Sequence, residues 1–221
     1  MNRLISLALA AAILGGGAWW YTTRPGPAGI DLGRATAQDA AAVDTSAIQE
    51  MTLGNPEAAV TVIEYASFTC PHCRNFNETV YPQLKADYID TGKIHFVYRE
   101  VYFDRFGLWA GMLARCGGGM RYFGIADVLY DTQSEWLAGG DPAAIADNLR
   151  RIGRSAGMND EEIGACMADE ATAKAMVALY QQNATADDVT STPTFIVNGT
   201  KYSNMGYEEF ARIIDAELPE G

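Results

Sequence analysis

"VIEYASFTCPHCRNF", residues 62–76, joins a short apolar run to two cysteines that are separated by only two residues. Aliphatic, β-branched and aromatic residues dominate the run, so we predict a buried central strand over residues 59–66. Apolar positions then recur every four residues, which predicts a helix with Pro71 in its first turn. Pro82 is expected to kink that helix. The cysteine pair therefore lies where a buried strand passes into a helix.

A cysteine at a helix N-terminus has altered chemistry. Unpaired amide hydrogens and the helix dipole favour negative charge there, so they favour the thiolate of Cys70 over its thiol. His72 is placed to add a hydrogen bond to the sulfur. A stabilised thiolate stabilises the reduced form, which makes a Cys70–Cys73 disulfide a stronger oxidant. Cys73, one turn deeper, is expected to be buried and to act as the resolving thiol.

Other uses of a cysteine pair fit the sequence less well. A zinc site of paired cysteines needs a second pair, but the remaining cysteines are isolated at positions 116 and 166, and the histidines are His72 and His95. Covalent haem attachment needs a histidine directly after the second cysteine, where Arg74 stands. We therefore expect no metal and no cofactor. A purely structural disulfide stays open, although such short loops stabilise poorly.

The rest of the chain predicts an α/β domain. A second strand is expected at "IHFVYRE", residues 94–100, and the residue pattern predicts helices from about residue 108 to residue 187. Residues 194–197 predict a strand, followed by a turn, a further short strand and a closing helix over residues 207–218. This order predicts a thioredoxin-like fold, a central sheet flanked by helices, with an all-helical insertion at about residues 105–188, between the second and third strands.

The first 24 residues predict export from the cytoplasm. Arg3 precedes an apolar run over residues 4–21, which is typical of a signal peptide or of a signal anchor, and both alternatives stay open. Residues 25–50, rich in Pro, Gly, Ala and Asp, predict a flexible tether to a domain at residues 51–221. We expect a protein of the bacterial cell envelope, periplasmic and tethered to the inner membrane.

The charge of the chain argues against one class of partner. It has 16 basic and 28 acidic residues and a net charge of −12. Such a surface repels phosphate backbones, so we expect no binding to nucleic acid.

The sequence also resembles a known family. "VIEYASFTCPHC", followed far downstream by "TSTPTFIVNG" at residues 190–199, looks like the DsbA-type thiol:disulfide oxidoreductases of bacterial envelopes. The resemblance extends from about Met51 to the C-terminus. It implies roles for a set of site residues: the nucleophile Cys70, its buried partner Cys73, the dipeptide Pro71 and His72 that tunes the redox poise, the cis-proline Pro193, Thr192 as a backbone site for substrate peptides, and Glu64 as a proton relay for Cys73.

The resemblance implies an enzyme that oxidises cysteine pairs to disulfides through a mixed-disulfide intermediate. Its substrates would be reduced or misfolded exported proteins, and a redox partner protein would restore Cys70 and Cys73. We expect a monomer, because the tail leaves no room for the dimerisation domain of related isomerases. Thr192 departs from the aliphatic residue of the best-known strong oxidant, so a disulfide isomerase or reductase stays open. A non-catalytic metallochaperone or holdase that uses the same thiols is the alternative from another class.

The two remaining cysteines lie on predicted helices of the insertion. In an oxidising compartment Cys116 and Cys166 most simply pair with each other, and some members of the resembled family have a second, structural bridge there. Free buried thiols are the alternative.

Overall fold

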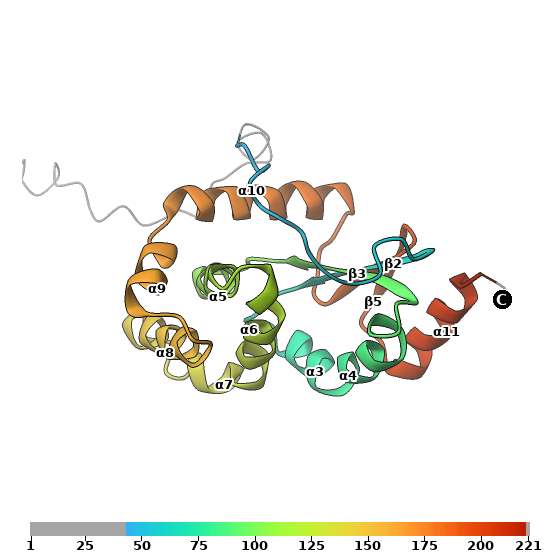
Figure 1. The fold of residues 1–221 in the computed structure, drawn as a ribbon, viewed down its shortest axis with the longest axis horizontal. Coiled ribbons are helices and arrows are strands. Elements are labelled where there is room, and N and C mark those ends of the chain that lie inside the picture. Colours follow the sequence, from blue (N-terminus) through green and yellow to red (C-terminus); the bar gives the residue numbers. More distant parts are fainter. Residues whose placement is uncertain (1–42, 220–221) are drawn as a thin grey trace, which may run out of the picture. The chain divides into compact units, whose positions relative to one another are not determined.

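The computed structural model describes residues 43–219, in which five strands form one mixed sheet in the order β1-β3-β2-β4-β5 (Figure 1). β2 and β3 run parallel, whereas the pairs β1–β3, β2–β4 and β4–β5 are antiparallel. The strands are Met51–Gly54 (β1), Val60–Ala66 (β2), Ile94–Glu100 (β3), Thr194–Val197 (β4) and Thr200–Ser203 (β5).

Helices cover both faces of the sheet (Figure 1). One face carries α3 (Pro71–Thr79), α4 (Tyr81–Leu84), the π-helix η1 (Lys85–Ile89) and α11 (Tyr207–Glu217), and the other carries α10 (Glu170–Ala186). The ring of Phe195 on β4 packs between Phe76 of α3 and Phe210 of α11, with centroid distances of 4.7 and 4.8 Å. One continuous core joins the face of the sheet that carries α3 to the inner sides of the helical insertion.

The insertion between β3 and β4 is helical in full. It consists of α5 (Arg105–Cys116), α6 (Gly119–Asp131), α7 (Gln133–Trp136), α8 (Pro142–Ser155), α9 (Asp160–Met167) and α10. Two of these helices begin at capping residues. Asp141 accepts a hydrogen bond from the amide of Ala144 at 2.9 Å, with Pro142 as the first helical residue, and Asn159 forms a capping box with Glu162.

Two details differ from the sequence prediction. Met51–Gly54 forms a strand that the sequence analysis missed, because four residues are too few to show a period. The helical insertion follows β3, which is the third strand along the chain. The sequence analysis counted it as the second strand because β1 was not predicted. Pro82 does more than kink a helix: the helix ends at Thr79 and a new one begins at Tyr81.

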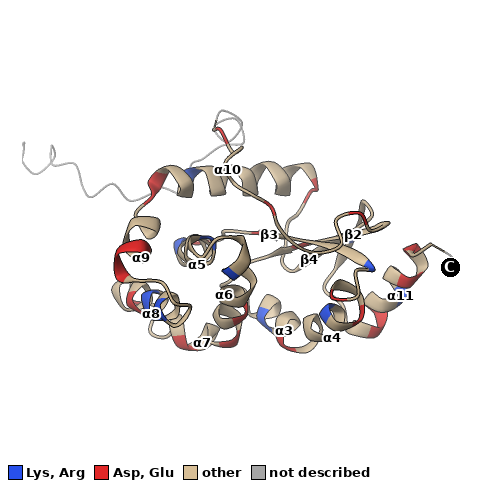
Figure 2. Cartoon of the chain, in the orientation of Figure 1, with Lys and Arg blue, Asp and Glu red and all other residues tan. Residues whose placement is uncertain are grey.

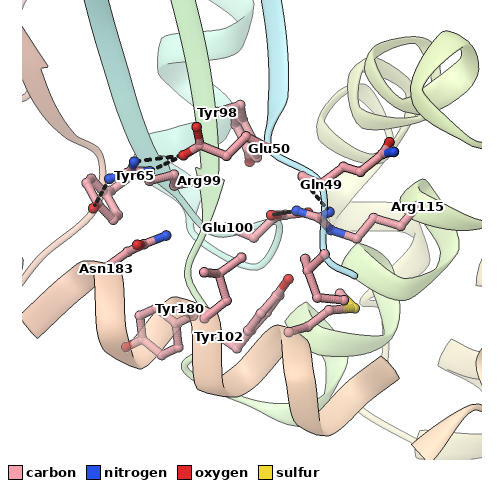
Figure 3. A pocket seen from close by; sticks show the side chains of 13 residues that line it. Gln49, Glu50, Tyr65, Tyr98, Arg99, Glu100, Tyr102, Arg115, Tyr180 and Asn183 are labelled. Atoms are coloured by element: carbon pink, nitrogen blue, oxygen red, sulfur yellow. Dashed lines mark hydrogen bonds and ion pairs between the residues drawn. The ribbon is translucent and has the colours of Figure 1, made fainter. Parts of the chain in front are cut away.

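The predicted signal segment lies outside the described residues, as does most of the predicted tether. In residues 43–219, no helix is long and apolar enough to cross a membrane. The last residues of the tether contact the domain (Figure 3): Gln49 accepts a hydrogen bond from Arg115 at 2.8 Å, and Glu50 pairs with Arg99 at 2.7 Å.

Charged residues are spread over the helices. Figure 2 shows basic residues scattered among more numerous acidic ones. This distribution agrees with the net charge of −12 and offers no basic stripe in this view.

Candidate active site

Cys70 and Cys73 lie at the start of α3, directly after the central strand β2. Cys70 is the N-cap of α3 with an extended backbone (φ −84°, ψ 120°), and Pro71 is the first helical residue. Both cysteines are free thiols; Cys70 is partly exposed and Cys73 is fully buried. The amide of Cys70 donates to the carbonyl of Ser67 at 3.0 Å, which closes the turn between strand and helix.

The surroundings of Cys70 favour its thiolate. The pKa of Cys70 is lowered to about 5, and the hydrogen bond from the Cys73 thiol is the largest cause. Burial opposes this shift, whereas Thr192 and the backbone amides of Cys73 and His72 at the helix N-terminus add to it. The side chain of His72 is exposed, so the contribution seen here comes from its backbone.

Cys73 has the opposite character. Burial raises the pKa of the Cys73 thiol, and the hydrogen bond to Cys70 raises it further. Cys73 is therefore a neutral donor when Cys70 is a thiolate. The two cysteines are chemically distinct because one faces solvent and helix amides while the other lies in the core.

Residues far along the chain complete the site. The peptide bond between Thr192 and Pro193 is cis, and the Cys70 thiol donates to the carbonyl of Thr192 at 3.6 Å. The Thr192 hydroxyl is buried and has no hydrogen-bond partner among the described residues. The Thr192 side chain lowers the pKa of Cys70 and of Cys73.

Glu64 lies in the core, on the central strand β2. It is only 4% exposed, and burial raises the pKa of its carboxyl to about 8. Its neighbours across the sheet are Tyr98 on β3 and Phe195 on β4. Burial raises the pKa of Tyr98 well above the usual value, and charge on Glu64 and on Cys73 adds to that shift. Glu64 and Cys73 therefore share one buried neighbourhood.

Two side chains of the insertion contact the active-site turn, and the sequence analysis missed both. Gln133, at the start of α7, donates to the carbonyl oxygens of Phe68 and Cys70 at 2.9 and 3.0 Å. Asp104, the N-cap of α5, accepts a hydrogen bond from the Thr69 hydroxyl at 2.8 Å. Neither residue belongs to a motif near the cysteines, so no spacing in the sequence could have indicated these contacts.

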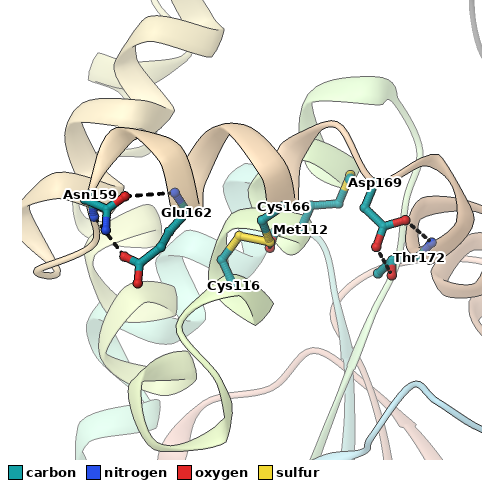
Figure 4. Close-up of a disulfide and its surroundings, with 7 residues drawn as sticks. All are labelled: Met112, Cys116, Asn159, Glu162, Cys166, Asp169 and Thr172. Atoms are coloured by element: carbon teal, nitrogen blue, oxygen red, sulfur yellow. Dashed lines mark hydrogen bonds between the residues drawn. A yellow bond between two sulfur atoms is a disulfide. The ribbon is translucent and has the colours of Figure 1, made fainter.

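Cys116 and Cys166 are joined by a disulfide between α5 and α9 (Figure 4). Their Cα atoms lie 5.9 Å apart across a sequence separation of 50 residues. The bridge belongs to the helical insertion. In the described residues, no group of three or more His, Cys, Asp or Glu side chains is arranged to hold a metal ion.

A cluster of polar side chains, separate from the cysteine pair, lies between the end of β3 and α10 (Figure 3). Arg115 donates to both carboxylate oxygens of Glu100, at 2.7 and 2.5 Å, and Tyr122 donates to the same carboxylate at 2.7 Å. The cavity beside this ion pair has a volume of about 20 Å³. It is large enough for a water molecule but not for a substrate.

Comparison with known proteins agrees with the geometry of the site. A family model described as Thioredoxin matches residues 46–216. Among curated proteins, the chain is 33% identical over 172 residues to a "Putative protein-disulfide oxidoreductase" of Rickettsia bellii, which covers 77% of this chain and 65% of that protein. It is 26% identical over 189 residues to "Disulfide bond formation protein D" of Bacillus subtilis, which covers 81% of this chain and 82% of that protein. The chain thus spans slightly less than two thirds of the rickettsial relative.

Solved structures give the same picture. Alpha-DsbA1 of Wolbachia pipientis is similar with a TM-score of 0.70 and 25% identity, over 82% of this chain and 95% of that one. A protein-disulfide isomerase of Novosphingobium aromaticivorans has a TM-score of 0.70 and 26% identity, over 77% and 98% of the two chains. BdbD of Bacillus subtilis, at 22% identity and a TM-score of 0.67 over 76% and 92%, shares the fold.

Proposed function

The chain belongs to the thioredoxin family, and from that premise we propose that it is a DsbA-like thiol:disulfide oxidoreductase that oxidises cysteine pairs of exported proteins to disulfides. The observation that carries the proposal is the contrast between the two thiols. Cys70 is accessible and its pKa is lowered to about 5, whereas Cys73 is buried with a raised pKa. A thiolate stabilised in this way stabilises the reduced enzyme, so the disulfide form accepts electrons readily.

The reaction begins with the Cys70–Cys73 disulfide. A thiolate of the substrate attacks the exposed sulfur of Cys70, a bond forms between these two sulfurs, and the bond to Cys73 breaks. Cys73 leaves as a thiolate and takes up a proton, because its buried sulfur disfavours charge. Glu64 is the nearby acid that we propose as the source of this proton, since its raised pKa keeps it protonated at neutral pH.

The second step releases the product. The other thiolate of the substrate attacks its own sulfur in the mixed disulfide and expels Cys70 as a thiolate. Two electrons have then passed from the substrate to the enzyme. Cys70 is a good leaving group because its thiolate is held by helix amides and by the Cys73 thiol.

We propose that Thr192 and Pro193 bind the substrate next to the sulfur. The carbonyl oxygen of Thr192 lies 3.6 Å from the Cys70 sulfur. An extended peptide can pair with such a backbone as it would with a strand. Pro71 and His72 form the rim of the site beside Cys70, and both are exposed.

The proposal extends to location and partners. The apolar residues 4–21 support export to the periplasm and attachment to the inner membrane. The substrates are reduced or misfolded exported proteins, and a separate redox protein reoxidises the pair. Cys116–Cys166 is assigned a structural role, because it joins two helices of the insertion.

Two assays test this function. Oxidised wild-type protein, with oxidised glutathione as the terminal oxidant, should speed the refolding of a reduced disulfide protein. Its equilibrium with glutathione should give an oxidising reduction potential. A potential near that of thioredoxin, about −270 mV, would instead indicate a reductase. If refolding is not accelerated, the enzymatic proposal is wrong.

Variants of the two cysteines separate their roles. In Cys73→Ser, the Cys70 thiolate can still attack a substrate disulfide, but no resolving thiol breaks the mixed disulfide. We expect a covalent complex that reducing agents release. Cys70→Ser is the matched control and should form no such complex.

A further inference from the structure

We propose that Gln133 is a positioning residue for the active site: by holding the carbonyls of Phe68 and Cys70, it keeps the Cys70 sulfur aimed at the first amides of α3. This inference rests on the proposed function and adds a residue of the insertion to it. Gln133 is 3% exposed, and it stands on α7, which lies 63 residues further along the chain than Cys70.

The two hydrogen bonds of Gln133 restrain both sides of one turn. Its Nε2 atom donates to Phe68 at 2.9 Å and to Cys70 at 3.0 Å, so both amide protons are used. The carbonyl of Cys70 also accepts the first intrahelical bond of α3, from the amide of Arg74 at 3.1 Å. The orientation of the peptide between Cys70 and Pro71 is thereby determined by two donors, one from its own helix and one from the insertion.

That orientation matters because α3 has no side-chain cap. The N-cap residue is Cys70, and its side chain makes no cap hydrogen bond. The backbone of His72 and of Cys73 at the start of α3 nevertheless lowers the pKa of the Cys70 thiol. A rotation of the Cys70 backbone would move the sulfur away from these amides and weaken their effect. Gln133 opposes such a rotation from the carbonyl side of the same residue.

The contact comes from the helical insertion. Gln133 shares α7 with Trp136, which is 2% exposed and donates through its indole to the carbonyl of Leu129 at 2.8 Å. The polar amide of Gln133 is thus carried on a packed helix and directed at the turn. A glutamine buried only for packing would not need to satisfy two carbonyls of the same turn.

The test compares Gln133→Leu with the wild-type protein. The thiolate absorbance of the reduced protein near 240 nm is followed against pH, and the glutathione equilibrium is measured in parallel. We expect the pKa of Cys70 to rise by about one unit. The equilibrium constant for oxidation of glutathione by the protein should fall about tenfold, which lowers the reduction potential by about 30 mV. A variant with wild-type values of both would overturn the proposal.

Trp136→Phe is the matched control. It removes a buried donor from the same helix but leaves Gln133 in place, so it should lower the melting temperature without changing the pKa of Cys70. A rise in that pKa equal to the one in Gln133→Leu would show that any damage to α7 has this effect, and it would refute a specific role for Gln133.

A measurement on the wild-type protein covers the case in which Gln133→Leu does not fold. The side-chain amide signals of Gln133 in an NMR titration should shift with the midpoint of the Cys70 thiolate. Constant signals would refute the contact between this side chain and the titrating site. If the wild-type Cys70 itself shows an ordinary pKa, the proposed function fails first, so the two failures are distinguishable.

Discussion

The stability of the reduced protein should depend on pH in a way that its oxidised form does not share. Cys70 has a folded-state pKa lowered to about 5, whereas an unfolded thiol titrates at about 8.5. A group with a lowered pKa contributes stability that is fully present above its unfolded pKa and is lost as the pH falls through its folded pKa. The oxidised protein has no such thiol, so the difference between the two forms isolates this effect.

The expected size follows from the surroundings of the sulfur. A fall in pKa from 9.0 to about 5 would correspond to about 5 kcal/mol for a fully buried group. Cys70 is only partly buried, so solvent screening reduces this value and we expect about 2 kcal/mol. Cys73 has a raised pKa because it is buried, so it reduces the stability of the reduced protein only near and above pH 8.5, where the unfolded thiol ionises. Glu64 titrates in both redox forms and cancels in the difference.

Urea unfolding of the reduced and oxidised proteins between pH 5 and pH 8 measures the difference. The reduced form should gain about 2 kcal/mol relative to the oxidised form across this range, with a slope of at most about 1.4 kcal/mol per pH unit for one thiol. Reduced Cys70→Ser should lose the dependence on pH. A pH-independent difference in the wild-type protein would refute the stabilised thiolate, and with it the physical basis of an oxidising pair.

Three further outcomes are expected. Glu64→Gln should increase the unfolding free energy at pH 7.5 by about 2 kcal/mol, because a carboxyl with a raised pKa costs stability as the pH rises from its unfolded-state pKa toward about 8. Stopped-flow kinetics of the same variant should show slower release of Cys73. An unchanged rate would argue against a proton relay. Replacing Cys116 and Cys166 together by alanine should cost about 4 kcal/mol in urea unfolding and leave the thiolate titration at the active site unchanged. Arg115→Met should lower the unfolding free energy by about 4 kcal/mol, because it leaves the carboxylate of Glu100 buried without its cation. The double variant with Glu100→Gln should recover part of that loss. If the losses of the two single variants simply add in the double variant, the pairing is contradicted.

Much of the fold could be predicted from local pattern. The central strand, the helix after it and the starts of α8 and α9 depend on side-chain periodicity and on caps, which act between residues close in sequence. Strand β1 could not be predicted in this way. It is four residues long and is held by its pairing with β3, whose partner residues lie more than 40 positions away. Such a strand exists because of the sheet and not because of its own sequence.

The chemistry of the candidate site likewise has a part that depends on residues close in sequence and a part that depends on long-range packing. Two cysteines at a helix N-terminus already indicate that one sulfur favours negative charge, because the amides responsible lie within the same turn. The burial of Glu64, the 3.6 Å distance between the Thr192 carbonyl and the Cys70 sulfur, and the two hydrogen bonds of Gln133 came only with the tertiary structure. Local hydrogen bonds follow from sequence spacing, whereas desolvation and long-range contacts depend on which segments pack together. The sequence by itself therefore determined that a reactive thiol pair exists and which thiol is the nucleophile, and the packing of sheet and insertion decided which distant residues surround the pair.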